Sequence, residues 1–143
     1  MQEIQPYLMF EGRCEEAIGF YTGSLGARLE FLMRNDETPE PPPPGMMPPG
    51  SEKKICHAEI TIGDSRIMLS DGMCSGSPSF AGFSLSIPVP DEATARRTFD
   101  ALAAGGQVRM PLGKTFFSPC FGMVQDRFGV GWMVIIPQEH PTA

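Results

Sequence analysis

Residues 14–26 read CEEAIGFYTGSLG, and the spacing of the apolar residues in this stretch decides how the surrounding chain folds. Its apolar residues recur at positions i, i+3, i+4 and i+7, which places them on one face of a helix. Acidic residues occupy the first turn, where the helix dipole favours them, and a glycine stands at the C-terminal stop. The stretch predicts an amphipathic helix that packs on a sheet. The residues of the apolar face are Cys14, Ala17, Ile18 and Tyr21, followed by Leu25 at i+11.

Strand-like segments flank this helix on both sides. Residues 4–10 are short and apolar, and residues 27–34 resemble a strand in composition. Residues 56–62, CHAEITI, alternate apolar and polar side chains with the period of a strand. A glycine-aspartate turn then leads into a partner strand over residues 66–70. The first half therefore predicts a strand, a helix and three strands.

The second half repeats this order. Residues 82–89 alternate like a strand, Asp91 is a suitable N-cap, and a helix is predicted to end at Gly105. Three strand-like segments follow. They cover residues 108–116, 121–125 and 130–136.

A weak internal repeat relates the two halves. Phe20 precedes Gly26 by the same number of residues as Phe99 precedes Gly105. We therefore predict one α+β domain, residues 1–143, built from two βαβββ modules. Module 1 covers about 3–74 and module 2 about 80–137. Their strands are expected to form a curled mixed sheet with the helices on its outer face.

Residues 35–54 interrupt module 1 and hold seven of the fifteen prolines. Proline lacks the N–H that a β-ladder needs, so this insertion is predicted to be an extended, polyproline-like loop. Three interpretations stay open: a surface insertion, a lid over a cavity, or an arm across a dimer.

Composition limits the partners of the chain. The formal net charge of −6 argues against a nucleic-acid partner, which would require a basic patch. No apolar run is long enough for a membrane span, and no signal peptide is expected. The four cysteines form no CxxC pair. We expect a cytoplasmic protein with reduced thiols and no membrane partner.

Several motifs together resemble a known family. They are PYLMFEG at 6–12, EAIGFY at 16–21, LGA at 25–27, IMLSD at 67–71, and the spaced FG, V, QD, FGV and WM over 121–133. This combination resembles PhnB-like proteins of the vicinal oxygen chelate (glyoxalase/bleomycin resistance/dioxygenase) superfamily, nearly from end to end. The resemblance implies eight strands curled around a cup, and a homodimer.

The resemblance also implies a metal site at four inward positions. Carried onto this sequence, these positions are Pro6, Met68, Ser84 and Met133, with Phe83 as an alternative to Ser84. Proline has no side-chain donor, a thioether is soft, and a serine hydroxyl is a weak ligand. We therefore expect no metal and no cofactor. Some members of this branch bear the label demethylubiquinone methyltransferase, but the chain has no glycine-rich cofactor loop.

The same strand registers predict the lining of a cup for a small organic molecule. Thioethers and small hydroxyls would make it adaptable and partly apolar. The expected cavity residues are Pro6, His57, Glu59, Met68, Ser70, Ser84, Ser86 and Met133.

His57 and Glu59 are the leading catalytic candidates. They lie two apart on one strand face, so the pair is suited either to acid–base work or to a structural hydrogen bond. The other histidine, His140, is expected to be exposed in the C-terminal tail. Asp71 is a candidate turn cap or cation receptor, and Cys56 is expected to pack in the core.

Three functions stay open at this point. The first is a metal-free binding or sequestering protein, like the bleomycin-resistance members. The second is an enzyme, of lyase, transferase or dioxygenase type, that uses displaced residues such as His57 and Glu59. The third is a structural dimer without a ligand, which predicts that the fold has no pocket of about 300 Å³ or more.

Overall fold

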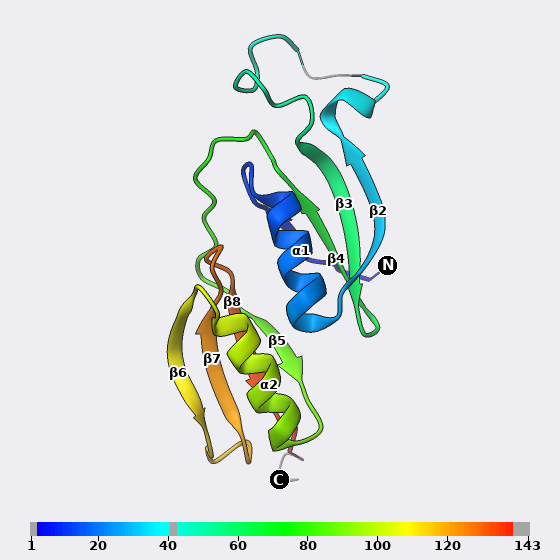
Figure 1. Cartoon of the computed structure of the whole chain (residues 1–143). Helices are drawn as coiled ribbons and strands as arrows, with labels where there is room; N and C mark the ends of the chain where they lie inside the picture. Colours follow the sequence, from blue (N-terminus) through cyan, green and yellow to red (C-terminus); the bar gives the residue numbers. More distant parts are fainter. Residues whose placement is uncertain (1–2, 41–42, 139–143) are drawn as a thin grey trace. The chain divides into compact units, whose positions relative to one another are not determined.

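The computed structural model describes residues 3–40 and 43–138, and the chain in it divides into two compact units (Figure 1). Unit 1 is Met1–Pro78 and unit 2 is Ser79–Ala143. Each unit contains one α-helix and one four-stranded sheet.

Unit 1 has the strand order β1-β4-β3-β2. β1 runs parallel to β4, whereas the other neighbours are antiparallel. This places the first strand beside the last one of the unit. The elements are β1 (Tyr7–Met9), α1 (Cys14–Leu25), β2 (Arg28–Arg34), the short 3-10 helix η1 (Asn35–Glu37), β3 (Ile55–Ile62) and β4 (Ser65–Ser70).

The helix α1 is held at its N-terminus by a residue from far along the chain. Asp71 is buried, and its carboxylate accepts backbone N–H groups from Gly12 at 2.9 Å, Cys14 at 2.8 Å and Ile55 at 2.7 Å. One side chain therefore satisfies donors of both the helix start and β3. Gly26 closes the other end in the left-handed conformation, with φ 67°.

Unit 2 has the equivalent strand order, β5-β8-β7-β6. β5 runs parallel to β8, and the remaining neighbours are antiparallel. The elements are β5 (Leu85–Pro88), α2 (Glu92–Ala103), β6 (Gln107–Gly113), β7 (Phe121–Gln125) and β8 (Gly131–Ile135).

The helix α2 is capped locally. The side chain of Asp91 accepts the backbone N–H of Thr94 at 2.7 Å, as the sequence predicts for an N-cap. After the helix, Gly106 passes close to β7. A Cβ at this position would lie 2.1 Å from the carbonyl oxygen of Gln125, so only glycine fits.

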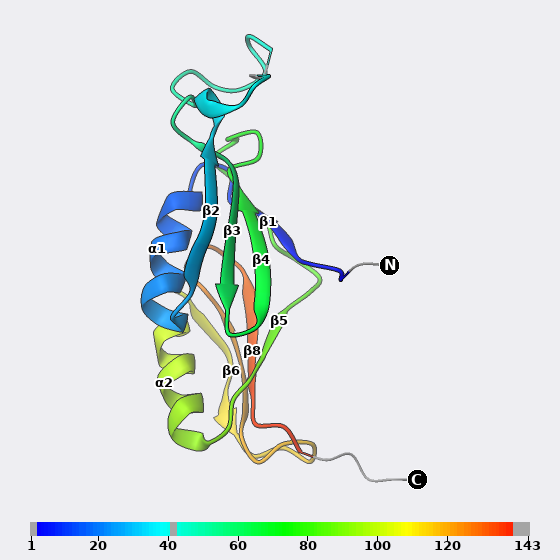
Figure 2. The ribbon, with the colours of Figure 1, turned by 90° about the vertical axis from the view of Figure 1, so that its right-hand side faces the viewer.

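Each helix covers one face of the sheet in its own unit (Figure 2). In unit 1 the covered face contributes Leu8, Ala58, Ile60 and Leu69 to the core. In unit 2 it contributes Val124, Trp132 and Val134. The opposite face of each sheet is called here the helix-free face of unit 1 or of unit 2.

The predicted α+β fold with two βαβββ modules is confirmed by the two equivalent sheets. Several strand ends differ from the prediction, most clearly at β1, β5 and β6. β5 begins at Leu85, whereas the strand was predicted from residue 82. β1 is shorter than residues 4–10, and Ile4 is 87% exposed. β6 ends at Gly113, because a turn follows in which Thr115 N–H bonds to the Ser118 carbonyl at 2.9 Å.

The proline-rich insertion begins with η1, where the sequence predicts only extended chain. Its base is tied by Asn35, whose backbone N–H bonds to the Lys54 carbonyl at 2.9 Å. The Asn35 side chain also donates to the Ser51 carbonyl at 2.9 Å. These bonds hold the two ends of the insertion together.

The described residues contain two α-helices, α1 and α2. Within residues 3–40 and 43–138, neither is long and apolar enough to cross a membrane.

Candidate functional site

A connected row of polar side chains lies on the helix-free face of unit 1. The Tyr7 hydroxyl lies 2.9 Å from Nδ1 of His57, and His57 Nε2 lies 3.4 Å from Oε2 of Glu59. Arg66 Nη1 donates to the other oxygen of Glu59 at 2.6 Å. The row therefore joins three neighbouring strands, β1, β4 and β3, with Tyr7 of β1 and His57 of β3 on either side of β4.

The partners of His57 determine how its ring is used. The Glu59 carboxylate can only accept, so the neutral ring places its proton on Nε2. Nδ1 is then an acceptor, and the Tyr7 hydroxyl donates to it. This assignment follows from the network, and it aligns the three groups for proton transfer from the Tyr7 hydroxyl to the imidazole.

The charges of the row are set by two opposite effects. The hydrogen bond from Arg66 lowers the pKa of Glu59 below its ordinary value, and His57 adds to this effect. Partial burial raises the pKa of the Tyr7 hydroxyl. At neutral pH, Glu59 is therefore a carboxylate and Tyr7 keeps its proton.

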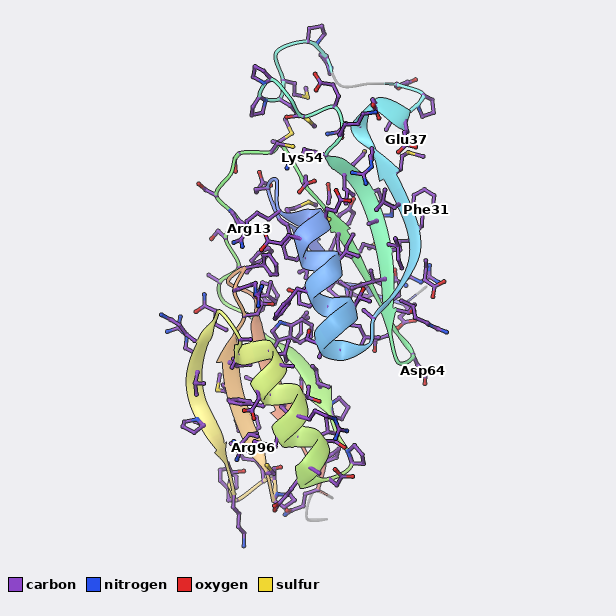
Figure 3. All side chains as sticks on the ribbon, in the orientation of Figure 1. Arg13, Phe31, Glu37, Lys54, Asp64 and Arg96 are labelled. Carbon is purple, nitrogen blue, oxygen red and sulfur yellow. The ribbon has the colours of Figure 1, made fainter. Side chains whose placement is uncertain are left out.

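Aromatic rings enclose the imidazole of His57. The Tyr7 ring lies 5.4 Å from it, centroid to centroid, and the Phe31 ring 5.9 Å. Figure 3 labels Phe31 on β2, the edge strand of this sheet. Met68 lies directly opposite both Tyr7 and Glu59 in the strand register. His57 is thus half-buried, with its side chain 28% exposed.

The strand register shows where one predicted cavity residue, Pro6, lies relative to Met68. Tyr7, and not Pro6, pairs with Met68 and takes the expected first-strand position. Pro6 precedes β1 and contributes its backbone carbonyl, which accepts the Met68 N–H at 3.0 Å. The reason is that side chains alternate along a strand, so an error of one residue turns a side chain to the other face.

Ser70 has a structural partner. Its hydroxyl accepts the Gly72 N–H at 2.9 Å and donates to the Ile55 carbonyl at 3.4 Å. The residue is buried, so its hydroxyl is engaged within the fold.

Thioethers line the helix-free face of unit 2. Met133 on β8 lies opposite Met123 on β7, and Met123 lies opposite Met110 on β6. On the other side, Ser86 of β5 lies opposite Met133. Three methionines therefore form a continuous row across three strands.

A hollow of about 320 Å³ opens in unit 2. Its walls include Phe80, Phe83 and Met123, and its polar lining includes Ser84 and Arg109. Ser84 lies just before β5, next to Gly131. Of the three predicted cavity residues in the second half, Ser84 lines this hollow, as does its alternative Phe83. Ser86 and Met133 lie on strands β5 and β8 of the sheet.

A second hollow, of about 790 Å³, belongs to the proline-rich insertion of unit 1. It is lined largely by prolines and by Met46 and Met47. Its charged lining residues are Asp36 and Glu52.

The residues at the expected metal positions do not fit a hard divalent ion. Those positions are Pro6, Met68, Ser84 (or Phe83) and Met133, and the strand register places Tyr7 opposite Met68 and Ser86 opposite Met133. A phenol, a hydroxyl and two thioethers form a poor donor set for such ions. In the part of the chain that the structure describes, no three His, Cys, Asp or Glu side chains are grouped to hold a metal.

The remaining residues that the sequence singled out either stabilise the fold or lie outside the site. Asp71 is the remote cap of α1, so its carboxylate is engaged by backbone N–H groups. Cys56 is only half-buried, although the sequence places it in the core. Trp132 is buried, and its ring N–H donates to Asp126 at 2.8 Å. His140 lies outside the described residues.

Four residues of the two helix-free faces were not predicted from the sequence. Tyr7 and Arg66 complete the row on unit 1, while Met110 and Met123 complete the thioether row on unit 2. The alternation of β3 and β4 carries the signal for Arg66, because Arg66 shares the face of Met68. For Tyr7, the register of the short strand β1 against β4 had to be known to within one residue.

A match to a family model shows which family the chain belongs to. The model described as 3-demethylubiquinone-9 3-methyltransferase matches residues 2–135. The chain belongs to this family. The expected resemblance to PhnB-like proteins is thereby confirmed, because this is the PhnB-like branch of the glyoxalase superfamily.

Relatives of this family match the chain along its length. Protein YjdN from Escherichia coli (strain K12) is 39% identical over 146 residues, covering 97% of this chain and 98% of that protein. The crystal structure of protein PA1353 from Pseudomonas aeruginosa has 40% identity and a TM-score of 0.82, covering 97% of this chain and 100% of that one.

A third relative has the name of the family. It is a putative 3-demethylubiquinone-9 3-methyltransferase, PhnB protein, from Bacillus cereus, with 31% identity and a TM-score of 0.77. The match covers 94% of this chain and 99% of that one.

A more distant structure supports the fold alone. A glyoxylase/bleomycin resistance protein/dioxygenase domain from Frankia sp. EAN1pec has 16% identity and a TM-score of 0.65, covering 96% of this chain and 97% of that one.

Proposed function

We propose that the protein binds a small organic molecule at the helix-free face of unit 2 and does so without a metal ion. The observation that carries this proposal is the row of Met110, Met123 and Met133, of which Met123 also lines a hollow of about 320 Å³. Methionine side chains are flexible and polarizable, so they adapt to irregular apolar ligands. The volume lies at the lower end of the range for ligand pockets, roughly 300–1,000 Å³.

The metal-free part of the proposal rests on donor chemistry. Thioethers and hydroxyls at the family's ligand positions favour an organic ligand over a hard cation. A purely structural role without a ligand is less well supported, since it requires a fold without a hollow of this size.

Thermal-shift screening of the full chain with a small-molecule library, after treatment with EDTA, tests the proposal. We expect some organic compounds to raise the Tm, because a ligand that binds only the folded state stabilises it. Met123→Lys should abolish this shift, because a charge replaces an apolar wall. The matched control is Met73→Lys, at an exposed methionine of unit 1. A shift that requires added metal, or that Met123→Lys leaves intact, contradicts the proposal.

One observation favours a second candidate function, acid–base catalysis by unit 1. The Tyr7–His57–Glu59 row provides a proton donor and an imidazole whose far nitrogen faces a carboxylate. We propose His57 as the base and Glu59 as the residue that orients it. NMR of the screened ligands with wild-type protein and with His57→Gln would test this. Ligand turnover should be lost in the variant while its fold remains; unchanged turnover contradicts catalysis.

We also propose that two copies of the chain form a homodimer, as the resemblance implies. Large apolar side chains exposed in the single chain support this, among them Leu29 at 49% and Val108 at 49%. Light scattering should give twice the 15.6 kDa mass of the chain; the mass of one chain contradicts the proposal. We further propose a cytoplasmic location, which is supported by four unpaired cysteines.

A further inference from the structure

Arg109 places a positive charge at the wall of the hollow in unit 2. The residue lies on β6 and donates Nη2 to Oε1 of Gln125. Gln125 in turn donates Nε2 to the Gly129 carbonyl at 3.4 Å, which fixes the orientation of its amide. The guanidinium is therefore held by a neutral partner. Within residues 3–40 and 43–138, no carboxylate forms an ion pair with Arg109.

The neighbouring walls are flat and apolar. Phe80 and Phe83 line the hollow together with Met123. Phe83 is 46% exposed, although it is a large aromatic side chain at the start of the second module. Aromatic and thioether walls of this kind favour a planar ring, which stacks on phenyl faces and contacts sulfur at its edge.

A second polar group of the hollow is kept accessible by a glycine. A Cβ at Gly131 would lie 2.9 Å from the Ser84 hydroxyl oxygen, so a side chain there would crowd this hydroxyl. Ser84 itself lines the hollow. The hydroxyl can therefore donate to, or accept from, a ligand beside the guanidinium.

We infer that the ligand of this hollow is a small planar organic acid, whose carboxylate pairs with Arg109 and whose ring lies against Phe80 and Phe83. This inference rests on the proposed binding function and specifies its ligand class. A guanidinium fork matches a carboxylate with two parallel hydrogen bonds, and it keeps its charge at every physiological pH. The volume of about 320 Å³ suits an acid with a single ring or with two fused rings.

The larger hollow of the insertion provides an internal contrast. Its charged lining residues are Asp36 and Glu52, both acidic. Lys53 pairs with Asp36 at 2.7 Å, but it is not among the lining residues, so the lining offers no cation to a carboxylate ligand. We therefore assign the acid to unit 2.

Isothermal titration calorimetry with naphthalene-2-carboxylate and its neutral amide, naphthalene-2-carboxamide, tests the inference on the full chain. We expect the carboxylate to bind at least tenfold more tightly than the carboxamide. Arg109→Gln should remove this difference while the carboxamide binds as before. Arg97→Gln, at an exposed arginine of α2, is the matched control and should change neither affinity. Phe83→Ala should weaken both compounds.

The other outcomes separate this inference from the proposed function. Equal affinity for the two compounds, unaffected by Arg109→Gln, overturns the acid ligand and leaves organic binding in place. Absence of binding by both compounds overturns the planar-acid inference. The proposed function then depends on the library screen alone. It fails if no compound raises the Tm, if the shift requires added metal, or if Met123→Lys leaves the shift intact.

Discussion

Unit 1 and unit 2 share one topology but differ in the chemistry of their helix-free faces. In unit 1 this face presents Tyr7, His57 and Glu59, which form a hydrogen-bonded row. In unit 2 this face presents Met123 on β7 and Met133 on β8, joined by Met110 on the edge strand β6. The doubled βαβββ plan therefore fixes where side chains lie but not what they do. Acid–base capacity is located in one half, and adaptable apolar surface in the other.

The helix caps differ between the units as well. α1 is capped by Asp71, which comes from the end of β4, whereas α2 is capped by its own Asp91. A remote cap ties the helix to the sheet, while a local cap stabilises only the first turn. This difference leads to the largest effect that we predict.

Replacing Asp71 should destabilise the protein far more than replacing Asp91. Asp71→Ala leaves three backbone N–H groups of the buried site without their acceptor, at a cost on the order of 4 kcal/mol. Asp91→Ala removes one exposed cap and should cost about 1 kcal/mol. Urea unfolding of both variants measures the two values. Equal losses would mean that Asp71 acts as an ordinary cap.

The turn after each helix is the next point of contrast. Unit 1 has Ala27 after Gly26, whereas unit 2 has Gly106 after Gly105. Gly106→Ala should cost about 3 kcal/mol, because its Cβ would lie 2.1 Å from the Gln125 carbonyl and the backbone must shift. Gly113→Ala, where the nearest such atom is 4.0 Å away, is the control. A stable Gly106→Ala protein would refute this close approach.

A smaller effect of opposite sign is expected inside α1. This helix contains Gly19 and Gly23 in its interior, whereas α2 contains no glycine. A Cβ at Gly19 meets no atom within 4 Å, so Gly19→Ala should stabilise the protein by about 0.5–1 kcal/mol through helix propensity. Differential scanning calorimetry should record a higher Tm. A lower Tm would indicate that Gly19 has a role beyond the helix.

The smallest effect on stability concerns the charges on unit 1. Arg66 lowers the pKa of Glu59, so Arg66→Gln should raise that pKa toward its ordinary value of about 4.3. Because the folded pKa is depressed, the pairing stabilises the protein above the ordinary pKa. This contribution is lost as the pH falls through the folded pKa. NMR titration of the Glu59 carboxyl carbon measures the shift. Arg28→Gln, at the Arg28–Glu30 pair, should leave it unchanged.

Much of the fold was predictable because its signals are local. The helical spacing around Ala17 and the alternation around His57 depend on neighbours within a few residues, so the elements and their order could be derived. The faces of the middle of β3 were also predicted correctly, with Ala58 and Ile60 in the core and His57 on the opposite side. At the start of the strand, Ile55 and not the predicted Cys56 is buried. The candidate site was predicted less completely, since its contacts join distant segments.

The sequence by itself determined the period of each element, the doubling of the βαβββ plan and the paired positions of His57 and Glu59. The tertiary structure decided that Tyr7, and not Pro6, stands beside Met68, and that Tyr7 reaches His57 fifty residues away. The physical reason is that alternation fixes which residues share a face within one strand, whereas register between strands is set by hydrogen bonds and packing across the sheet. A shift of one residue in that register decides whether Pro6 or the phenol of Tyr7 lies opposite Met68.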